Sequence, residues 1–135
     1  MTLVLDTSVV SALMRRETDA LARLANENPG DVLLSSPVLA EIRFGLERLA
    51  PGRRRELLRA EWVRLRAVLG WCDWTEPAAE AFGREKARLE RSGTPLDDMD
   101  IAIGSIAIAS SARLATRNVR HFRRLVGITT EDWST

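Results

Sequence analysis

The sequence predicts an α/β protein, a three-layer α/β/α arrangement with a mostly parallel central sheet of four to five strands. Short apolar segments alternate with longer segments of helical periodicity along the whole chain, and Asn-, Pro- and Gly-containing stop signals separate them. No repeat or low-complexity linker interrupts this alternation. With 135 residues, the chain is expected to form one domain over residues 1–135.

Five short segments have the character of strands. Residues 2–5 (TLVL) form the first, and DVLLS at 31–35 follows the stop signal Asn28-Pro29-Gly30. The residues at 71–74 are compatible with a short strand or a simple connector. RLAT at 113–116 and a segment near 126–129 complete the expected sheet.

Helical periodicity fills the intervals between these strands. In the first helix Val9, Val10 and Leu13 share the apolar side. Ser36 has the residue type of an N-cap and Pro37 that of a first helical position, for a helix that continues to about residue 49. Further helices are expected at 18–28, from Pro51-Gly52 to about 69, at 75–92, at 97–110 and around 119–125.

Composition excludes several classes of protein. The only cysteine, Cys72, excludes an internal disulfide and a cysteine-rich metal site. The apolar amino terminus is interrupted by Asp6 and lacks the basic start of a signal peptide. No stretch reaches the roughly 18–20 apolar residues of a membrane span. We therefore expect a soluble cytoplasmic protein with no membrane partner.

The distribution of charge is more informative than the net charge of +1. Lys86 is the only lysine, and arginines cluster at 53–55 and at 117–124. The planar guanidinium group of arginine suits phosphate recognition. A high-GC genome would also enrich arginine, so composition alone leaves nucleic-acid binding open.

Polar side chains from segments far apart in sequence are expected at one edge of the sheet. Asp6 ends the first strand, Glu41 lies one turn into the helix after the second strand, and Asp100 lies in the first turn of the helix after Gly93-Thr94-Pro95. Residues 116–118 (Thr-Arg-Asn) end the strand that follows. Because ligands of open parallel sheets bind at the carboxyl ends of the strands, this convergence predicts a site there.

Clustered carboxylates repel one another unless a positive group lies between them. A hard divalent cation such as Mg²⁺ meets this need, because it takes oxygen ligands and keeps several waters. It can also activate water and stabilise charge on a phosphodiester. No other nucleophile or base is credible, because His121 is the only histidine and Cys72 lies away from this edge.

Each acidic residue also has a purely structural interpretation. Asp6 could serve only as a helix N-cap, and Glu41 or Asp100 could stabilise a helix start through its dipole. Asp97, three residues before Asp100, fits an N-cap better than a ligand. The joint placement of the carboxylates, rather than any one of them, favours a site.

The motifs resemble those of the PIN-domain ribonucleases, specifically the VapC and FitB-like toxins of type II toxin–antitoxin systems. VLDTSVV at 4–10 is similar to the first acidic motif, and SPVLAEIRFGLERL at 36–49 to the second. The third block corresponds to residues 93–122, and GITTEDW at 127–133 is similar to the last strand and tail. The resemblance spans nearly the whole chain.

The resemblance implies a metal-dependent endoribonuclease. Its register selects Asp100 rather than Asp97 or Asp98, with Mg²⁺ or Mn²⁺ held chiefly by Asp6 and Asp100 and with Glu41 completing the catalytic cluster. The remaining implied residues support or extend this cluster: Thr7 and Thr116 by hydrogen bonds, Asn118 by lining the site, and Arg117 and Arg120 by binding the RNA backbone. A homodimer and an inhibitory VapB-like antitoxin are also implied.

Two departures from the family pattern concern the metal. Many relatives carry an acidic residue at or near Asn118 and an aspartate at the position of His121. One fewer carboxylate weakens a second metal site, so we expect one ion rather than two.

Three functional hypotheses follow. The first is an endoribonuclease toxin that cleaves single-stranded or loop RNA through metal-activated water. The second is a catalytically degenerate PIN domain acting as a binding or assembly module, supported only by Asn118 and His121. The third is a phosphatase with an aspartyl-phosphate, which lacks the required second aspartate because Ser8 occupies its place.

Overall fold

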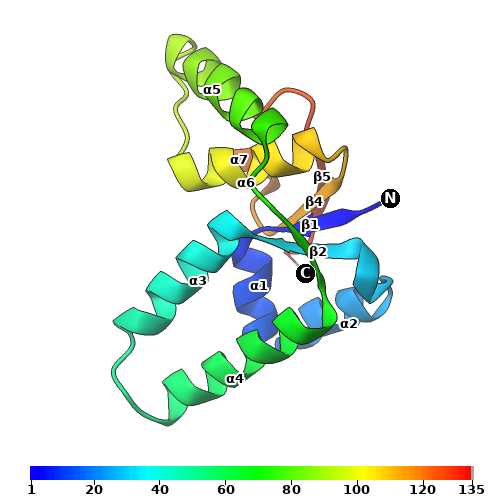
Figure 1. Cartoon of the computed structure of the whole chain (residues 1–135), viewed down its shortest axis with the longest axis vertical. Coiled ribbons are helices and arrows are strands. Elements are labelled where there is room, and N and C mark those ends of the chain that lie inside the picture. The colour runs from blue at the N-terminus through cyan, green and yellow to red at the C-terminus, as the bar shows by residue number, and fades with distance from the viewer. Residues whose placement is uncertain (135) are drawn as a thin grey trace.

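The computed structural model describes residues 1–134, which build a five-stranded sheet with helices on both faces (Figure 1). The strands are β1 (Leu3–Leu5), β2 (Val32–Ser35), β3 (Gly70–Cys72), β4 (Arg113–Thr116) and β5 (Thr129–Asp132). They lie in the order β3-β2-β1-β4-β5, and every neighbouring pair is parallel. The predicted three-layer α/β/α class is confirmed.

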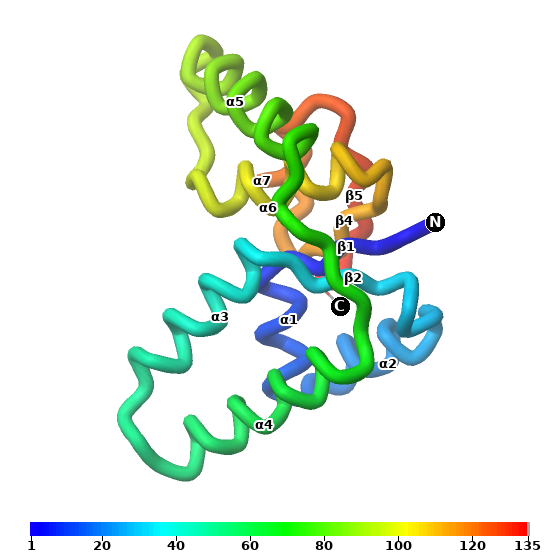
Figure 2. The backbone as a smooth tube through the Cα atoms, viewed as in Figure 1, coloured from blue at the N-terminus to red at the C-terminus, as the bar shows by residue number. Residues whose placement is uncertain are grey.

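The helices form two layers. One layer contains α1 (Thr7–Met14), α2 (Thr18–Ala25), α3 (Ser36–Arg48) and α4 (Arg53–Val68). The other contains α5 (Glu76–Arg91), α6 (Asp98–Ala109) and the short α7 (Val119–Phe122). The tube in Figure 2 shows α3 and α4 as two arms that extend away from the sheet and meet at a turn. None of the described helices is long and apolar enough to cross a membrane.

The core lies where both helix layers meet the sheet. All three residues of β1 are fully buried, as are Leu114 of β4 and Ile103 of α6. Such two-sided burial explains why the central strands read as continuous apolar runs. Val9, Val10 and Leu13, the predicted apolar side of α1, are buried as well.

Several predicted boundaries were wrong, each for a local reason. The second helix ends at Ala25, because Asn28 caps a 3₁₀ turn at Pro29–Asp31 instead of ending an α-helix. Ser36 is the first residue of α3 rather than its N-cap. The last strand begins at Thr129 because Gly127, with φ of 88°, turns the chain before it.

A buried carboxylate ties the α5–α7 layer to the end of the chain. Glu85 of α5 is 1% exposed and accepts hydrogen bonds from Arg88 and from the backbone amide of Val126, the latter at 2.6 Å. Burial raises its pKa, but these hydrogen bonds outweigh burial and lower the pKa below 4.5 overall. Glu85 is therefore ionised in the folded protein at neutral pH.

We expect Glu85→Gln to destabilise the protein by about 1.5–3 kcal/mol at pH 7, because charge-assisted hydrogen bonds to a buried carboxylate are lost. A carboxyl with a lowered folded-state pKa stabilises the fold above its unfolded pKa. The difference between variant and wild type should therefore shrink as the pH falls below 4.5. Urea unfolding at several pH values measures it. The exposed Glu80→Gln on the same helix is the control, and an equal loss in both variants would contradict the prediction.

Candidate active site

The sheet order places a crevice between β1 and β4. From β1 the chain proceeds to β2 and β3 on one side, and from β4 to β5 on the other. Such a switch point, at the carboxyl ends of the strands, is where open α/β sheets bind ligands. Asp6 directly follows β1, and Thr116 is the last residue of β4. The pairing of Leu5 with Ala115 brings these two residues side by side.

Asp6 is a buried carboxylate, 4% exposed, with both oxygens engaged. Oδ1 accepts hydrogen bonds from the Ser8 hydroxyl at 2.7 Å and from the amide of Val9 at 2.9 Å. Oδ2 accepts one from the Thr116 hydroxyl at 2.6 Å. Asp6 is therefore the N-cap of α1 and also a fixed acidic group at the switch point.

Glu41 and Asp100 approach Asp6 from opposite helix layers. Glu41 on α3 accepts a hydrogen bond from the Thr7 hydroxyl at the start of α1. Asp100 on α6 lies near enough to Asp6 and Glu41 for both to raise its pKa. The structure thus brings the three predicted acidic residues together, and it places Thr7 and Thr116 against two of them.

The two aspartates near Asp100 in the sequence make contacts outside this cluster. Asp97 is the N-cap of α6 and accepts a hydrogen bond from the amide of Met99 at 3.0 Å, as predicted. Asp98 is exposed and pairs with Lys86 at 2.9 Å. Asp100, in contrast, pairs with His121 of α7.

Burial and neighbouring negative charges both raise the pKa of carboxyl groups at this site. Burial raises the pKa of Asp6, although hydrogen bonds from Thr116, Ser8 and Val9 oppose the rise. Burial, together with the charges of Asp97, Glu41 and Asp6, raises the pKa of Asp100 to about 6, while the charge of His121 opposes the rise. The cluster is thus electrostatically unfavourable by itself and would be relieved by a cation.

The donor chemistry fits a hard divalent cation. Carboxylate and hydroxyl oxygens surround the crevice, and Mg²⁺ needs only one or two carboxylates when water and phosphate complete its octahedron. Within residues 1–134, no group of three or more acidic, histidine or cysteine side chains is arranged so that it could hold a metal ion by itself, so water and substrate oxygens would have to complete the coordination. An open, oxygen-rich site with repelling carboxylates is therefore what the structure offers.

Asn118 lies between β4 and α7, and His121 lies within α7. The Asn118 side chain caps α7 by accepting a hydrogen bond from the amide of His121, and its Nδ2 lies 3.0 Å from Nδ1 of His121. Nε2 of His121 lies 3.3 Å from Oδ2 of Asp100. The contact of His121 with Asp100 was not predicted from the sequence. The available signal was the three-residue spacing of Asn118 and His121, which indicates a capped turn.

Ser8 is a second residue that sequence reasoning missed. It donates to Asp6 and accepts a hydrogen bond from the backbone amide of Arg117 at 3.2 Å. The only available signal was its position two residues after Asp6, where a hydroxyl can return to a capping carboxylate. The Arg117 side chain itself is directed to Glu17, at 2.9 Å, and Arg120 is exposed on α7.

A groove leads away from the carboxylates. It begins at Thr7 and Glu41 and passes between α1, α3 and α4. Its walls combine apolar and arginine side chains, among them Met14, Arg15, Ile42, Leu46, Arg54 and Leu58.

Comparison with known proteins identifies the fold and its family. The family model described as PIN domain matches residues 3–128, so the chain belongs to the PIN-domain family. Its relatives place it among the VapC proteins of that family. The tRNA(fMet)-specific endonuclease VapC of Shigella flexneri is 30% identical over 131 residues, which cover 97% of both chains.

Two further comparisons agree. Ribonuclease VapC19 of Mycobacterium tuberculosis is 36% identical over 120 residues, covering 88% of this chain and 90% of the relative. The crystal structure of DNA-bound VapBC from Salmonella typhimurium contains a chain with a TM-score of 0.85 and 28% identity, covering 98% of each chain.

The raised pKa of Asp100 leads to a stability prediction. A carboxyl whose folded-state pKa is about 6, against an ordinary value of 3.8, keeps its proton longer in the folded state. The stability of the metal-free protein should therefore fall as the pH rises from about 4 to 6. Asp100→Asn should remove this fall and stabilise the protein at pH 7.5 by about 1 kcal/mol, a figure reduced for partial exposure.

Urea unfolding in EDTA at pH 4.5 and 7.5 measures this effect. Asp98→Asn is the matched control, since Asp98 is exposed and paired with Lys86. An Asp100→Asn variant that is less stable than wild type at pH 7.5 would show that the Asp100 carboxylate stabilises the fold, contrary to the prediction.

Proposed function

We propose that this chain, as one PIN domain, is an endoribonuclease toxin of a type II toxin–antitoxin system. The observation that carries the proposal is the convergence of Asp6, Glu41 and Asp100 at the switch point of a chain that belongs to the PIN-domain family. Relatives that align over nearly the whole chain are named ribonucleases or endonucleases.

The proposed cofactor is one Mg²⁺ or Mn²⁺ ion held chiefly by Asp6 and Asp100. Such an ion would supply an activated water and stabilise the charge that develops on the phosphodiester. The second ion expected in two-metal nucleases is not proposed, because Asn118 and His121 stand where many relatives have acidic residues.

The protein side chains have distinct proposed roles. Thr116 and Ser8 fix the orientation of the Asp6 carboxylate, whose two oxygens they engage. Thr7 donates a hydrogen bond that holds Glu41, and Glu41 would help to hold the ion and the attacking water. Asn118 shapes the mouth of the crevice through its cap on α7.

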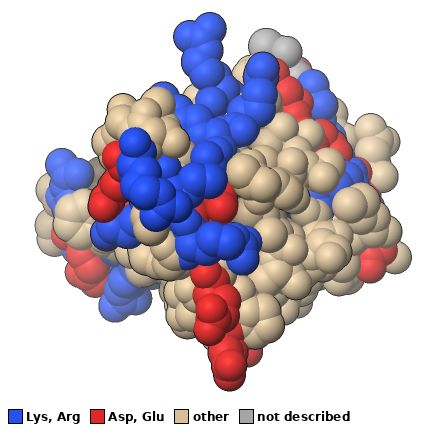
Figure 3. All heavy atoms as spheres, turned by 90° about the horizontal axis from the view of Figure 1, so that it is seen from above, with Lys and Arg blue, Asp and Glu red and all other residues tan. Residues whose placement is uncertain are grey.

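The proposed substrate is single-stranded or loop RNA. Contacts with its phosphates would position the strand without reading its bases. Arg117 follows β4 at the switch point and Arg120 is exposed on α7, and both would hold the RNA backbone. On the side of the molecule nearest α5, Figure 3 shows Lys and Arg side chains gathered into a patch. Exposed arginines on α5 and after α7 include Arg84, Arg91, Arg123 and Arg124.

The proposed partner is a VapB-like antitoxin bound in the groove between α1, α3 and α4. The combination of apolar walls and arginines suits an amphipathic segment that carries acidic residues. Because the groove begins at Glu41, a segment bound there would reach the carboxylates and exclude RNA. A homodimer of the toxin is proposed from the family resemblance alone.

We expect Asp6→Asn, Glu41→Gln and Asp100→Asn each to reduce RNA cleavage at least about 100-fold, because each removes a carboxylate from the proposed metal site. EDTA should abolish cleavage by wild type, and Mg²⁺ or Mn²⁺ should restore it. Cleavage of a mixed RNA panel by purified, antitoxin-free protein measures this.

The matched control is Asp98→Asn, which removes a carboxylate two residues from Asp100 but outside the cluster. It should retain wild-type cleavage. A folded wild type that binds the metal without cleaving any RNA would favour the degenerate binding module instead.

The groove proposal is tested by Gly45→Trp. Gly45 lies on the groove wall, and a Cβ at this position meets no atom within 4 Å. The bulky side chain should therefore fill the groove without disturbing the core, weakening inhibition by the cognate antitoxin about tenfold or more while RNA cleavage persists.

Gly83→Trp on α5 provides the control, since its Cβ is equally unobstructed and lies outside the groove. Inhibition curves for both variants give the comparison. Equal inhibition of Gly45→Trp and wild type would place the antitoxin elsewhere.

A further inference from the structure

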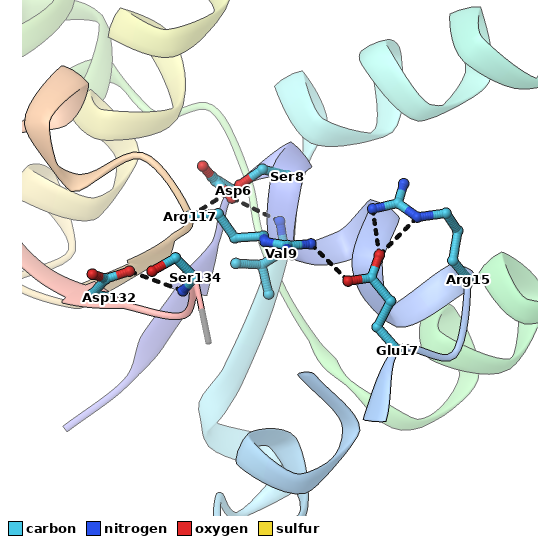
Figure 4. A network of polar contacts seen from close by, with 8 residues as sticks. All are labelled: Asp6, Ser8, Val9, Arg15, Glu17, Arg117, Asp132 and Ser134. Atoms are coloured by element: carbon cyan, nitrogen blue, oxygen red, sulfur yellow. Dashed lines mark hydrogen bonds and ion pairs between the residues drawn. The ribbon is translucent and has the colours of Figure 1, made fainter. Parts of the chain in front are cut away.

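Glu17 lies between two arginines, Arg15 at the end of α1 and Arg117 after β4 (Figure 4). One oxygen, Oε2, accepts hydrogen bonds from Nε of Arg15 at 2.8 Å and lies 2.7 Å from Nη2 of the same residue. The other oxygen, Oε1, accepts a hydrogen bond from Nη1 of Arg117 at 2.9 Å. One carboxylate therefore engages two guanidinium groups.

Both arginines belong to surfaces that the proposed function uses. The backbone amide of Arg117 donates a hydrogen bond to Ser8, and Ser8 donates one to Asp6. A chain of two hydrogen bonds therefore connects Arg117 to the proposed metal ligand. Arg15 lines the groove that begins at Glu41. Glu17 thus contacts one arginine from each of these surfaces without being one of the acidic residues of the cluster.

The ion pairs of Glu17 with Arg15 and Arg117 contribute little to the stability of the fold. The side chains of Arg117 and Glu17 are 34% and 38% exposed, and water and salt screen ion pairs of this exposure. Hydrogen bonds from Arg15 and Arg117 lower the pKa of Glu17. The carboxylate is therefore charged at neutral pH, where an RNA phosphate would compete with it for the same nitrogens.

Resting on the proposed ribonuclease function, we propose that Glu17 is a specificity-determining residue that competes with RNA phosphate for Arg117. A phosphate that binds the Arg117 guanidinium must displace Glu17 from it, and the displaced carboxylate, held near by Arg15, repels the phosphate. RNA without a well-placed phosphate therefore gains little from Arg117. Only an RNA whose backbone geometry replaces the contact with Glu17 recovers the full interaction.

The test compares wild type with Glu17→Gln, which keeps the size of the side chain and removes its charge. Binding of a labelled single-stranded RNA is measured in EDTA over a series of salt concentrations. We expect Glu17→Gln to bind about three- to tenfold more tightly at low salt. The slope of log affinity against log salt should steepen by about 0.7, the value for one additional phosphate contact on a single strand.

Three further variants separate the mechanism from its alternatives. Arg117→Ala in the Glu17→Gln background should abolish the gain, and Glu17→Asp should return binding toward wild type. Glu56→Gln changes the net charge equally on exposed α4 and should leave affinity unchanged. With metal present, Glu17→Gln should lower KM for RNA while kcat is retained, which a merely structural change would not do.

Each contrary outcome identifies what has failed. Unchanged or weaker RNA binding by Glu17→Gln, an equal gain in Glu56→Gln, or a gain that survives Arg117→Ala would each overturn the role of Glu17. A wild type that neither binds nor cleaves RNA would overturn the proposed function, and the role of Glu17 with it.

Discussion

The hydrogen-bonded burial of Asp6 is the constraint on which the site depends. A carboxylate removed from water is costly unless donors surround it, and here donors come from α1 and from β4. The same bonds fasten the two strands on either side of the switch point and fix where the carboxylate lies. Because Asp6 is held in this way, Glu41 and Asp100 can approach it only by bringing further negative charge into a partly desolvated crevice.

The two helix layers give this charged crevice two different surroundings. The α1–α4 layer opens into an apolar groove with arginines on its walls, which suits a folded or folding peptide partner. The α5–α7 layer and the end of β4 carry exposed arginines, which suit an extended polyanion. In the proposed function both partners reach the same carboxylates. An antitoxin in the groove would then exclude RNA from this edge of the sheet by occupying it, without a conformational switch.

Much of the fold was predictable because local sequence and tertiary structure agree. Buried central strands read as apolar runs, and Asp97 was recognisable as the residue that caps a helix. The last strand was misplaced because β5 is a polar edge strand, paired only with β4 and preceded by a glycine turn. At the site, strand ends identified the acidic residues. The contacts of His121 with Asp100 and of Glu17 with Arg117 join separate segments and leave no periodic trace in the sequence.

The most direct test of the account is a crystal of the antitoxin-free protein soaked in Mn²⁺ and measured at a wavelength where manganese scatters anomalously. The account predicts an anomalous peak at the switch point within coordinating distance of carboxylate oxygens of Asp6 and Asp100, and no such peak in crystals of Asp100→Asn. A saturating soak that leaves this crevice empty, or that places manganese only at other carboxylates, would contradict the claim that the Asp6 cluster exists to hold a cation.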